Sequence, residues 1–190
     1  ICIWKPSEKT RLTSLAPTAL FVRAVARFTA AGNTVPDGLM ALLVGERAVG
    51  EILVDHPKVA VLSATGSTAM GRAVAPKLAA RFARAILELG GNNAGIVCPS
   101  ADLDLTLRAV AFAAMGTAGQ RCTSLRRLFV HSGVYDKLVP RLIKAYGSVT
   151  IGNPLHSGIL IGPLIDARAY QGMERALNDA RQAGGTVHGG

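Results

Sequence analysis

The stretch Val59–Gly71 of this 190-residue sequence reads Val-Ala-Val-Leu-Ser-Ala-Thr-Gly-Ser-Thr-Ala-Met-Gly. Its first four residues are all apolar, which predicts a strand over 59–62 that is buried on both faces. Ser67 is a residue type that caps helices, and a helical pattern follows over 67–84. A strand-to-helix turn that contains Gly66 and Ser67 can bind a phosphate through backbone N–H groups. An ordinary helix cap is the alternative, and this stretch alone leaves both open.

The alternation of strand-like and helical patterns extends in both directions from this turn. It indicates βαβ units and a parallel sheet that helices cover on both faces. The expected fold class is α/β, with a parallel Rossmann-like sheet in residues 1–89 and part of a second α/β domain in residues 90–190. Further strands are expected at about 1–4, 86–89, 96–97, 127–131 and 186–188, with a short apolar run at 39–44. Further helices are expected at about 13–31, 48–55, 104–115, 134–146 and 167–183.

Composition narrows the class of protein. A hydrophobic content of 49% with 17% charged residues is ample for a buried core and argues against disorder. The net charge of +9 comes from scattered bases, and only 5% of the residues are aromatic, so nucleic-acid binding is not expected. No apolar run approaches the roughly 20 residues that span a bilayer, and no membrane association is expected. Three widely spaced cysteines do not suggest disulfides, which favours a cytoplasmic protein.

Glu88 lies inside an apolar strand pattern and is followed by Gly90-Gly91. If the carboxylate is buried there, desolvation raises its pKa and makes it a useful general base near neutral pH. The two glycines would let the backbone pass close to other groups. A glutamate at a strand end that faces solvent is the alternative interpretation.

Cys122 lies in a glycine-rich loop, Gly116–Thr123, directly after Arg121. A neighbouring positive charge favours the thiolate, which is the nucleophilic form of cysteine, and Glu88 would be a suitable base for it. Cys2 and Cys98 lie in apolar runs and are expected to be buried. The four histidines show no metal-ligand spacing, so no metal site is expected.

Lys5 and Glu8 are three residues apart, just after the first expected strand. At a junction between strand and helix, both side chains could hold the hydroxyl groups of a ribose. A carboxylate at that point would repel a 2′-phosphate, which favours NAD over NADP. A surface ion pair is the alternative.

Six segments together resemble the aldehyde dehydrogenase superfamily, and they occur in the family's order along the chain. Within the superfamily, Gly90–Asn93 and Gly116–Cys122 resemble the antiquitin branch. That branch oxidises α-aminoadipic semialdehyde, in equilibrium with piperideine-6-carboxylate, in lysine degradation. The six segments are Trp4–Thr10, Thr65–Thr68, Leu87–Gly91, Gly119–Cys122, Ile151–Pro154 and Gly162–Leu164.

The resemblance implies a role for each candidate residue. Cys122 would attack the aldehyde to form a thiohemiacetal, its backbone N–H would form half of the oxyanion hole, and NAD would accept the hydride. Glu88 would activate the water that hydrolyses the resulting thioester, and Arg121 is a candidate for binding a distal carboxylate of the substrate. The implied cofactor-binding residues are Lys5, Glu8, Gly66, Ser67, Gly71 and Leu89.

The sequence also departs from the family. Ala64 stands where many members have Phe, which we interpret as a feature of the branch. The Pro-Trp-Asn and Glu-x-Phe-Gly-Pro segments and the oligomerisation strands are absent, so we expect an internal segment of a longer dimeric or tetrameric enzyme, with little turnover alone. A catalytically incomplete segment that retains a nucleotide-binding surface is one alternative. A dehydrogenase that makes an acyl-CoA is another, which Glu88 argues against.

Overall fold

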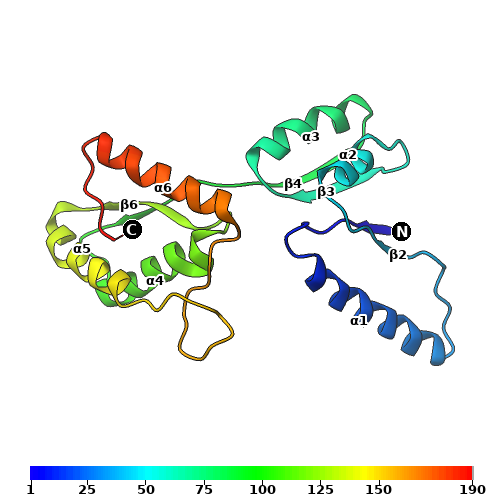
Figure 1. Ribbon diagram of the computed structural model, residues 1–190, viewed down its shortest axis with the longest axis horizontal. Coiled ribbons are helices and arrows are strands. Elements are labelled where there is room, and N and C mark those ends of the chain that lie inside the picture. The colour runs from blue at the N-terminus through cyan, green and yellow to red at the C-terminus, as the bar shows by residue number, and fades with distance from the viewer. Residues whose placement is uncertain (190) are drawn as a thin grey trace. The chain divides into compact units, whose positions relative to one another are not determined.

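The computed structural model describes residues 1–189, which form two compact units, Ile1–Glu88 and Leu89–Gly190 (Figure 1). Strands and helices alternate through both, which confirms the expected α/β class. The first unit contains β1 (Cys2–Trp4), α1 (Arg11–Ala30), β2 (Met40–Leu42), α2 (Arg47–Asp55), β3 (Val61–Thr65), α3 (Thr68–Ala80) and β4 (Arg84–Glu88). The second contains β5 (Asn93–Val97), α4 (Leu103–Met115), the 3₁₀ helix η1 (Gly116–Gly119), β6 (Leu125–Val130), α5 (Ser132–Gly147) and α6 (Ala167–Gln182).

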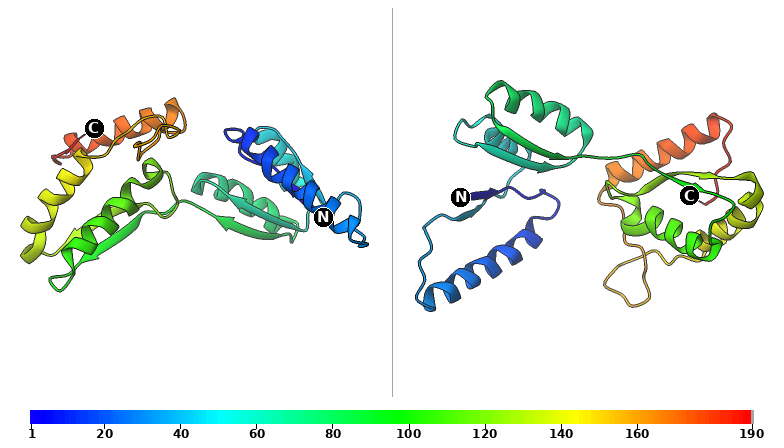
Figure 2. Two further views of the ribbon diagram at one scale, coloured as in Figure 1. Left: turned by 90° about the horizontal axis from the view of Figure 1, so that it is seen from below. Right: turned by 180° about the vertical axis from the view of Figure 1, so that it is seen from behind.

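The strands pair in parallel, as the alternation predicts. β1 pairs with β2, β3 with β4, and β5 with β6, and one α-helix connects the two strands of each pair, followed by η1 in the third. Each pair is therefore a βαβ unit, with α1, α3 and α4 as the crossover helices (Figure 2). The carboxyl ends of the two strands in each pair consequently lie at the same edge.

Local sequence signals account for several helix ends. Gly32 adopts a φ of 86°, its N–H donates to Thr29, and the Asn33 N–H donates to Phe28, which together close α1. The Asp102 carboxylate accepts hydrogen bonds from the N–H groups of Asp104 and Leu105 at the start of α4. These two bonds stabilise the ionised form and lower the pKa of Asp102.

Each unit has a small apolar core. In the first, Leu78 of α3 is fully buried, and the Arg81 guanidinium donates to the carbonyl oxygens of Val54 and Val59. In the second, α4 and α5 pack on the β5–β6 pair around one buried cluster. Its members are Val97, Val134 and Leu138, with Ala101, Leu103, Leu107, Leu128, Val130 and Leu142 packed against them.

Three expectations about burial and strand position are wrong. β3 spans Val61–Thr65 rather than 59–62, and residues along it alternate between exposed and half-buried because helices cover one face of the pair. Cys2 and Cys98 are exposed rather than buried. The strand expected at 186–188 is absent, since residues 185–189 run as irregular chain without a pairing partner.

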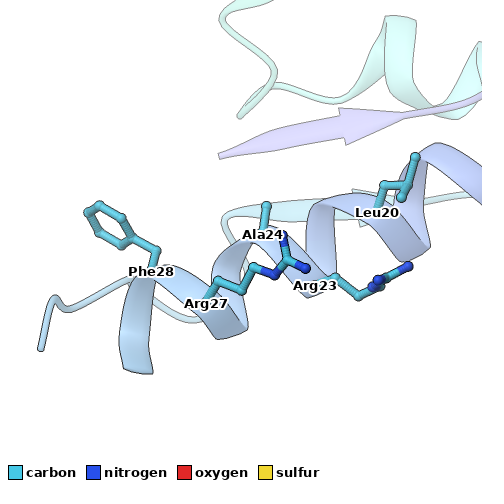
Figure 3. Close-up of a pocket in the computed structure, with 5 residues that line it drawn as sticks. All are labelled: Leu20, Arg23, Ala24, Arg27 and Phe28. Carbon is cyan, nitrogen blue, oxygen red and sulfur yellow. The ribbon is translucent and has the colours of Figure 1, made fainter. Parts of the chain in front are cut away.

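A hollow of about 490 Å³ runs along the exposed surface of α1 (Figure 3). All of its lining residues come from this one helix, and none is an acid, a cysteine or a histidine, so it offers no catalytic group. The hollow is lined by Leu20, Arg23, Ala24, Arg27 and Phe28.

No helix within residues 1–189 combines the length and apolarity needed to cross a bilayer.

We expect Leu138→Ala to destabilise the protein by about 2–5 kcal/mol, because Leu138 is fully buried and truncation leaves a cavity. Urea unfolding followed by circular dichroism measures this loss. Leu155→Ala is the matched control, since Leu155 is 89% exposed and its truncation should change stability by less than about 0.5 kcal/mol. Equal effects of the two substitutions would contradict this description of the core.

Candidate active site

The candidate nucleophile Cys122 is exposed in a turn that directly precedes β6. The loop before it is strained, because Thr117 and Ala118 have φ values of 57° and 54°, in the left-handed region that non-glycine residues rarely adopt. Each such residue costs about 1–3 kcal/mol, so other contacts must hold the loop in place. Gly119, with a φ of 69°, continues the left-handed run without that cost.

Ser124 anchors the turn from inside. Its side chain is fully buried, its Oγ accepts a hydrogen bond from the Arg121 N–H at 3.1 Å, and its own N–H donates to the Arg121 carbonyl at 3.2 Å. Because Arg121 and Ser124 are bonded in both directions, the two residues between them are held in a closed turn.

Two longer contacts attach the loop to the rest of the second unit. Gln120 accepts a hydrogen bond through its side-chain oxygen from the Ile165 N–H, at 2.9 Å and across 45 positions of sequence. Arg126 donates to the Gly119 carbonyl oxygen at 3.2 Å. The β5–β6 register is irregular at this point, since Asn93 is opposite Leu125 while Ala94 is opposite Arg127, so Arg126 is an extra residue at a bulge.

Residues of α4 and η1 hold the Arg121 guanidinium. Its Nε donates to Thr117 Oγ1 at 2.8 Å, and its carbon lies 5.3 Å from the centre of the Phe112 ring. Gly116 makes room for it, because a Cβ there would lie 3.2 Å from Nη1. Within residues 1–189 the two Nη groups form no hydrogen bond, so they remain available for a carboxylate.

Asn93, the first residue of β5, and Gly91, two positions before it, approach the turn closely. The Asn93 amide nitrogen donates to the carbonyl oxygens of Cys122, at 2.7 Å, and of Ser124, at 3.0 Å. A Cβ on Gly91 would lie 2.9 Å from the Cys122 carbonyl oxygen and 3.1 Å from Asn93 Oδ1. The close approach expected of this glycine is therefore present.

Glu88 is the last residue of β4 and lies directly opposite Thr65, the last residue of β3. Its carbonyl oxygen accepts a hydrogen bond of 2.9 Å from the Gly66 N–H. The candidate base and the candidate phosphate-binding turn therefore share one sheet edge. The Glu88 side chain is exposed in the structure, as the alternative of a glutamate at a strand end that faces solvent predicts.

The start of α3 has the features of an anion site. Ser67 is its N-cap residue and accepts a hydrogen bond from the Met70 N–H at 3.1 Å, as the ordinary-cap alternative predicts. The hydroxyl proton of Ser67 stays available, and the N–H groups of Thr68 and Ala69 form no hydrogen bond within residues 1–189. Capping and phosphate binding are thus compatible here. Gly71 is buried in the first turns of this helix.

Lys5 and Glu8 also lie close together. The Lys5 ammonium donates to the carbonyl oxygens of Pro6, at 2.8 Å, and Gly45, at 3.0 Å, and lies 3.9 Å from the Glu8 carboxylate. The Lys5 side chain is 18% exposed and that of Glu8 46% exposed. A ribose at this position would meet a fixed cation and an accessible acid.

The structure brings together Lys5 with Glu8, and the Gly66–Ser67 turn with Glu88. Glu88 belongs to the first unit and Cys122 to the second, so the pairing of these two residues stays a prediction. Leu89 also belongs to the second unit, and its contact with the cofactor stays a prediction. Sequence reasoning missed the role of Asn93, because nothing in its local pattern indicates a contact 29 positions away.

A cavity of about 900 Å³ lies within the second unit, between α4, α5, β6 and the segment around Ile161. Its lining is mostly apolar and includes Ala118 and Gly119 of the loop but not Cys122, so it is not the pocket of the nucleophile. Residues 1–189 hold no group of three or more His, Cys, Asp or Glu side chains suited to a metal ion.

This combination of a βαβ fold, an exposed cysteine in an anchored turn and an acid beside a candidate phosphate-binding turn is typical of a nucleotide-dependent enzyme with a thiol nucleophile. The profile of the aldehyde dehydrogenase family matches residues 1–190, so the chain belongs to that family.

The chain is 41% identical over 187 residues to the α-aminoadipic semialdehyde dehydrogenase of Mus musculus, covering 98% of this chain and 34% of that protein. It is 37% identical over 185 residues to aldehyde dehydrogenase family 7 member B4 of Arabidopsis thaliana, covering 97% and 35%. These relatives confirm the expected antiquitin branch. The chain spans about a third of the length of the curated relatives that it matches.

Solved structures agree with this assignment. A lactaldehyde dehydrogenase superposes with a TM-score of 0.89 at 34% identity, covering 99% of this chain and 38% of that one. Betaine aldehyde dehydrogenase from Staphylococcus aureus, in complex with NAD⁺, also has a TM-score of 0.89, at 27% identity, covering 99% and 36%. Both likenesses confirm the aldehyde dehydrogenase fold.

We expect Gly91→Ala to loosen the Cys122 turn, because the new methyl group would overlap the Cys122 carbonyl oxygen. Amide hydrogen exchange in peptides that cover 121–124 should become faster than in the unmodified protein. Gly147→Ala is the control, since a Cβ there meets nothing within 4 Å. Unchanged exchange in Gly91→Ala would contradict the close packing described here.

Proposed function

We propose that the protein containing this chain oxidises an aldehyde to a carboxylic acid, with NAD as the electron acceptor. The observation that carries the proposal is the exposed Cys122 in a turn anchored at both ends, within a chain of this family. Strained, heavily bonded loops are expensive to maintain, and they occur where a reactive group must be held in one orientation.

The proposed reaction begins at Cys122. Its thiolate adds to the aldehyde carbon, and the carbonyl oxygen takes the charge, giving a thiohemiacetal. The Cys122 N–H forms no hydrogen bond within residues 1–189, so it can donate to that oxygen. NAD, when bound, supplies the acceptor for the hydride that leaves the carbon, and a thioester remains on Cys122.

Glu88 then acts as the general base. Its carboxylate takes a proton from water, the hydroxide attacks the thioester, and the Cys122 thiolate leaves as the carboxylic acid forms. The exposure of Glu88 lets water reach it, and the hydrogen bond between its carbonyl oxygen and Gly66 fixes its position relative to the phosphate-binding turn.

The cofactor would bind along the edge formed by β3 and β4. The start of α3, with the Ser67 hydroxyl and the N–H groups of Thr68 and Ala69, would hold the pyrophosphate. Lys5 and Glu8 would hold the adenosine ribose, and Leu89 would contact the cofactor. Because the Glu8 carboxylate would repel a 2′-phosphate, we propose NAD rather than NADP.

The proposed substrate is a semialdehyde that carries a distal carboxylate, such as α-aminoadipic semialdehyde. Arg121 supports this choice, since Thr117 and Phe112 hold its guanidinium while neither Nη group forms a hydrogen bond within residues 1–189. Two parallel N–H donors are the arrangement that binds a carboxylate in bidentate fashion. The name of the murine relative indicates the same substrate for that enzyme.

We expect Cys122→Ser to abolish NADH production, because a serine hydroxyl is a much weaker nucleophile than a thiolate. Glu88→Gln should lower kcat by roughly 10²–10⁴-fold, the usual contribution of a general base. Absorbance at 340 nm, with NAD and NADP compared, measures both effects in the full-length protein. Glu46→Gln, which changes an exposed acid at the start of α2, should leave the rate unchanged. Turnover retained by Cys122→Ser would refute the mechanism.

We expect Arg121→Lys to raise the KM for α-aminoadipic semialdehyde about tenfold and leave that for an unbranched aliphatic aldehyde unchanged. Lysine keeps the charge but loses the bidentate geometry. Steady-state kinetics with both aldehydes measures the difference, and Arg23→Lys on α1 is the control. An equal change for the two aldehydes would argue against a carboxylate contact.

A further inference from the structure

The Asn93 amide nitrogen holds the turn that contains Cys122 at two points. Its nitrogen has two hydrogens, one for the Cys122 carbonyl oxygen at 2.7 Å and one for the Ser124 carbonyl oxygen at 3.0 Å. Asn93 is the first residue of β5 and is half-buried, so its backbone is fixed by the strand pair. The amide thus connects a rigid strand to the turn that carries Cys122.

These bonds determine where the backbone of the turn points. In a trans peptide the C=O and N–H point in opposite directions. The Arg121 carbonyl oxygen accepts from the Ser124 N–H inside the turn, so the Cys122 N–H points outward. Asn93 fixes the next peptide by its carbonyl oxygen, and the Cys122 Cα–Cβ bond between the two peptides is thereby oriented as well.

The strain in the preceding loop makes these anchors necessary. Thr117 and Ala118 adopt the left-handed conformation, and they would relax if the turn that follows were released. The Asn93 bonds hold the turn from β5, in addition to the anchor that Ser124 provides through Arg121.

We propose that Asn93 is a positioning residue that keeps the Cys122 N–H and the Cys122 thiol in a fixed relative orientation. The thiolate can then attack the carbon of a carbonyl group while the N–H donates to the oxygen of the same group. The inference rests on the function proposed for Cys122. Asn93 touches neither substrate nor cofactor in this role, and acts through the two carbonyl oxygens.

Two reagents separate positioning from general loss of structure. With p-nitrophenyl acetate, the Cys122 thiolate adds to the ester carbonyl, the oxygen becomes an oxyanion, and p-nitrophenolate leaves as an acetyl thioester forms. With iodoacetamide, the thiolate displaces iodide from a CH₂ group, and no oxyanion forms. Only the first reaction needs a correctly aimed N–H.

We expect Asn93→Ala in the full-length protein to slow acylation of Cys122 about tenfold or more relative to its alkylation, because a turn released from β5 no longer holds the thiol and the oxyanion donor in register. Asn93→Ser, which keeps a single donor, should give an intermediate ratio. Release of p-nitrophenolate and mass spectrometry of the Cys122 peptide measure the two rates, with the exposed Cys2 and Cys98 as references for alkylation.

Asn92→Ala is the matched control, since within residues 1–189 the neighbouring Asn92 forms hydrogen bonds through its backbone oxygen alone, to Arg127. It should leave the ratio at the wild-type value. If Asn93→Ala does not fold, Asn93→Ser alone decides the question. An unchanged ratio in the folded variants overturns the inference and leaves the proposed function intact. Absence of both acylation and NADH production in the wild-type protein refutes the proposed function, and the inference with it.

Discussion

The two hydrogen bonds from the Asn93 amide to the Cys122 and Ser124 carbonyl oxygens are the contacts on which the proposed geometry of the nucleophile Cys122 depends. They join a strand to a turn 29 positions further along the chain. Without them, the turn would lose its hydrogen bonds to β5 and would depend on Ser124 and on the contacts of the strained loop before it. A reactive thiol that must meet a carbonyl at a defined angle requires more restraint than that.

The side chains proposed to act in binding and catalysis lie at the carboxyl ends of strands in the first unit and at the amino ends of strands in the second. In the first, the phosphate-binding turn and Glu88 are at the carboxyl ends of β3 and β4, where parallel strands present their ligand-binding loops. In the second, Asn93 and the Cys122 turn are at the amino ends of β5 and β6. The segment from Glu88 to Asn93 passes from one kind of edge to the other in five steps, so the proposed base and the positioning residue are close neighbours in sequence.

Much of this arrangement is predictable from the sequence. Alternating periodicities predicted the βαβ units, and Ser67 predicted the start of α3 through local backbone chemistry. Burial was predicted less well, as the half-exposed β3 shows. An apolar run favours a strand, but it does not show which faces of that strand other elements cover. The Asn93 contact could not be predicted, since asparagine is common in loops and its partners are carbonyl oxygens, which every residue carries.

The environment of Lys5 distinguishes between the two interpretations of the Lys5–Glu8 pair. In a simple surface ion pair, the carboxylate is the main partner of the ammonium and both side chains remain mobile. Here two backbone carbonyl oxygens, at 2.8 and 3.0 Å, hold the Lys5 ammonium, while Glu8 stays 3.9 Å away and about half exposed. The cation is therefore fixed independently of the acid, and the carboxylate keeps its oxygens for another donor. A pair of vicinal ribose hydroxyls supplies such donors and also accepts from the third ammonium hydrogen, which favours the nucleotide-binding interpretation on chemical grounds.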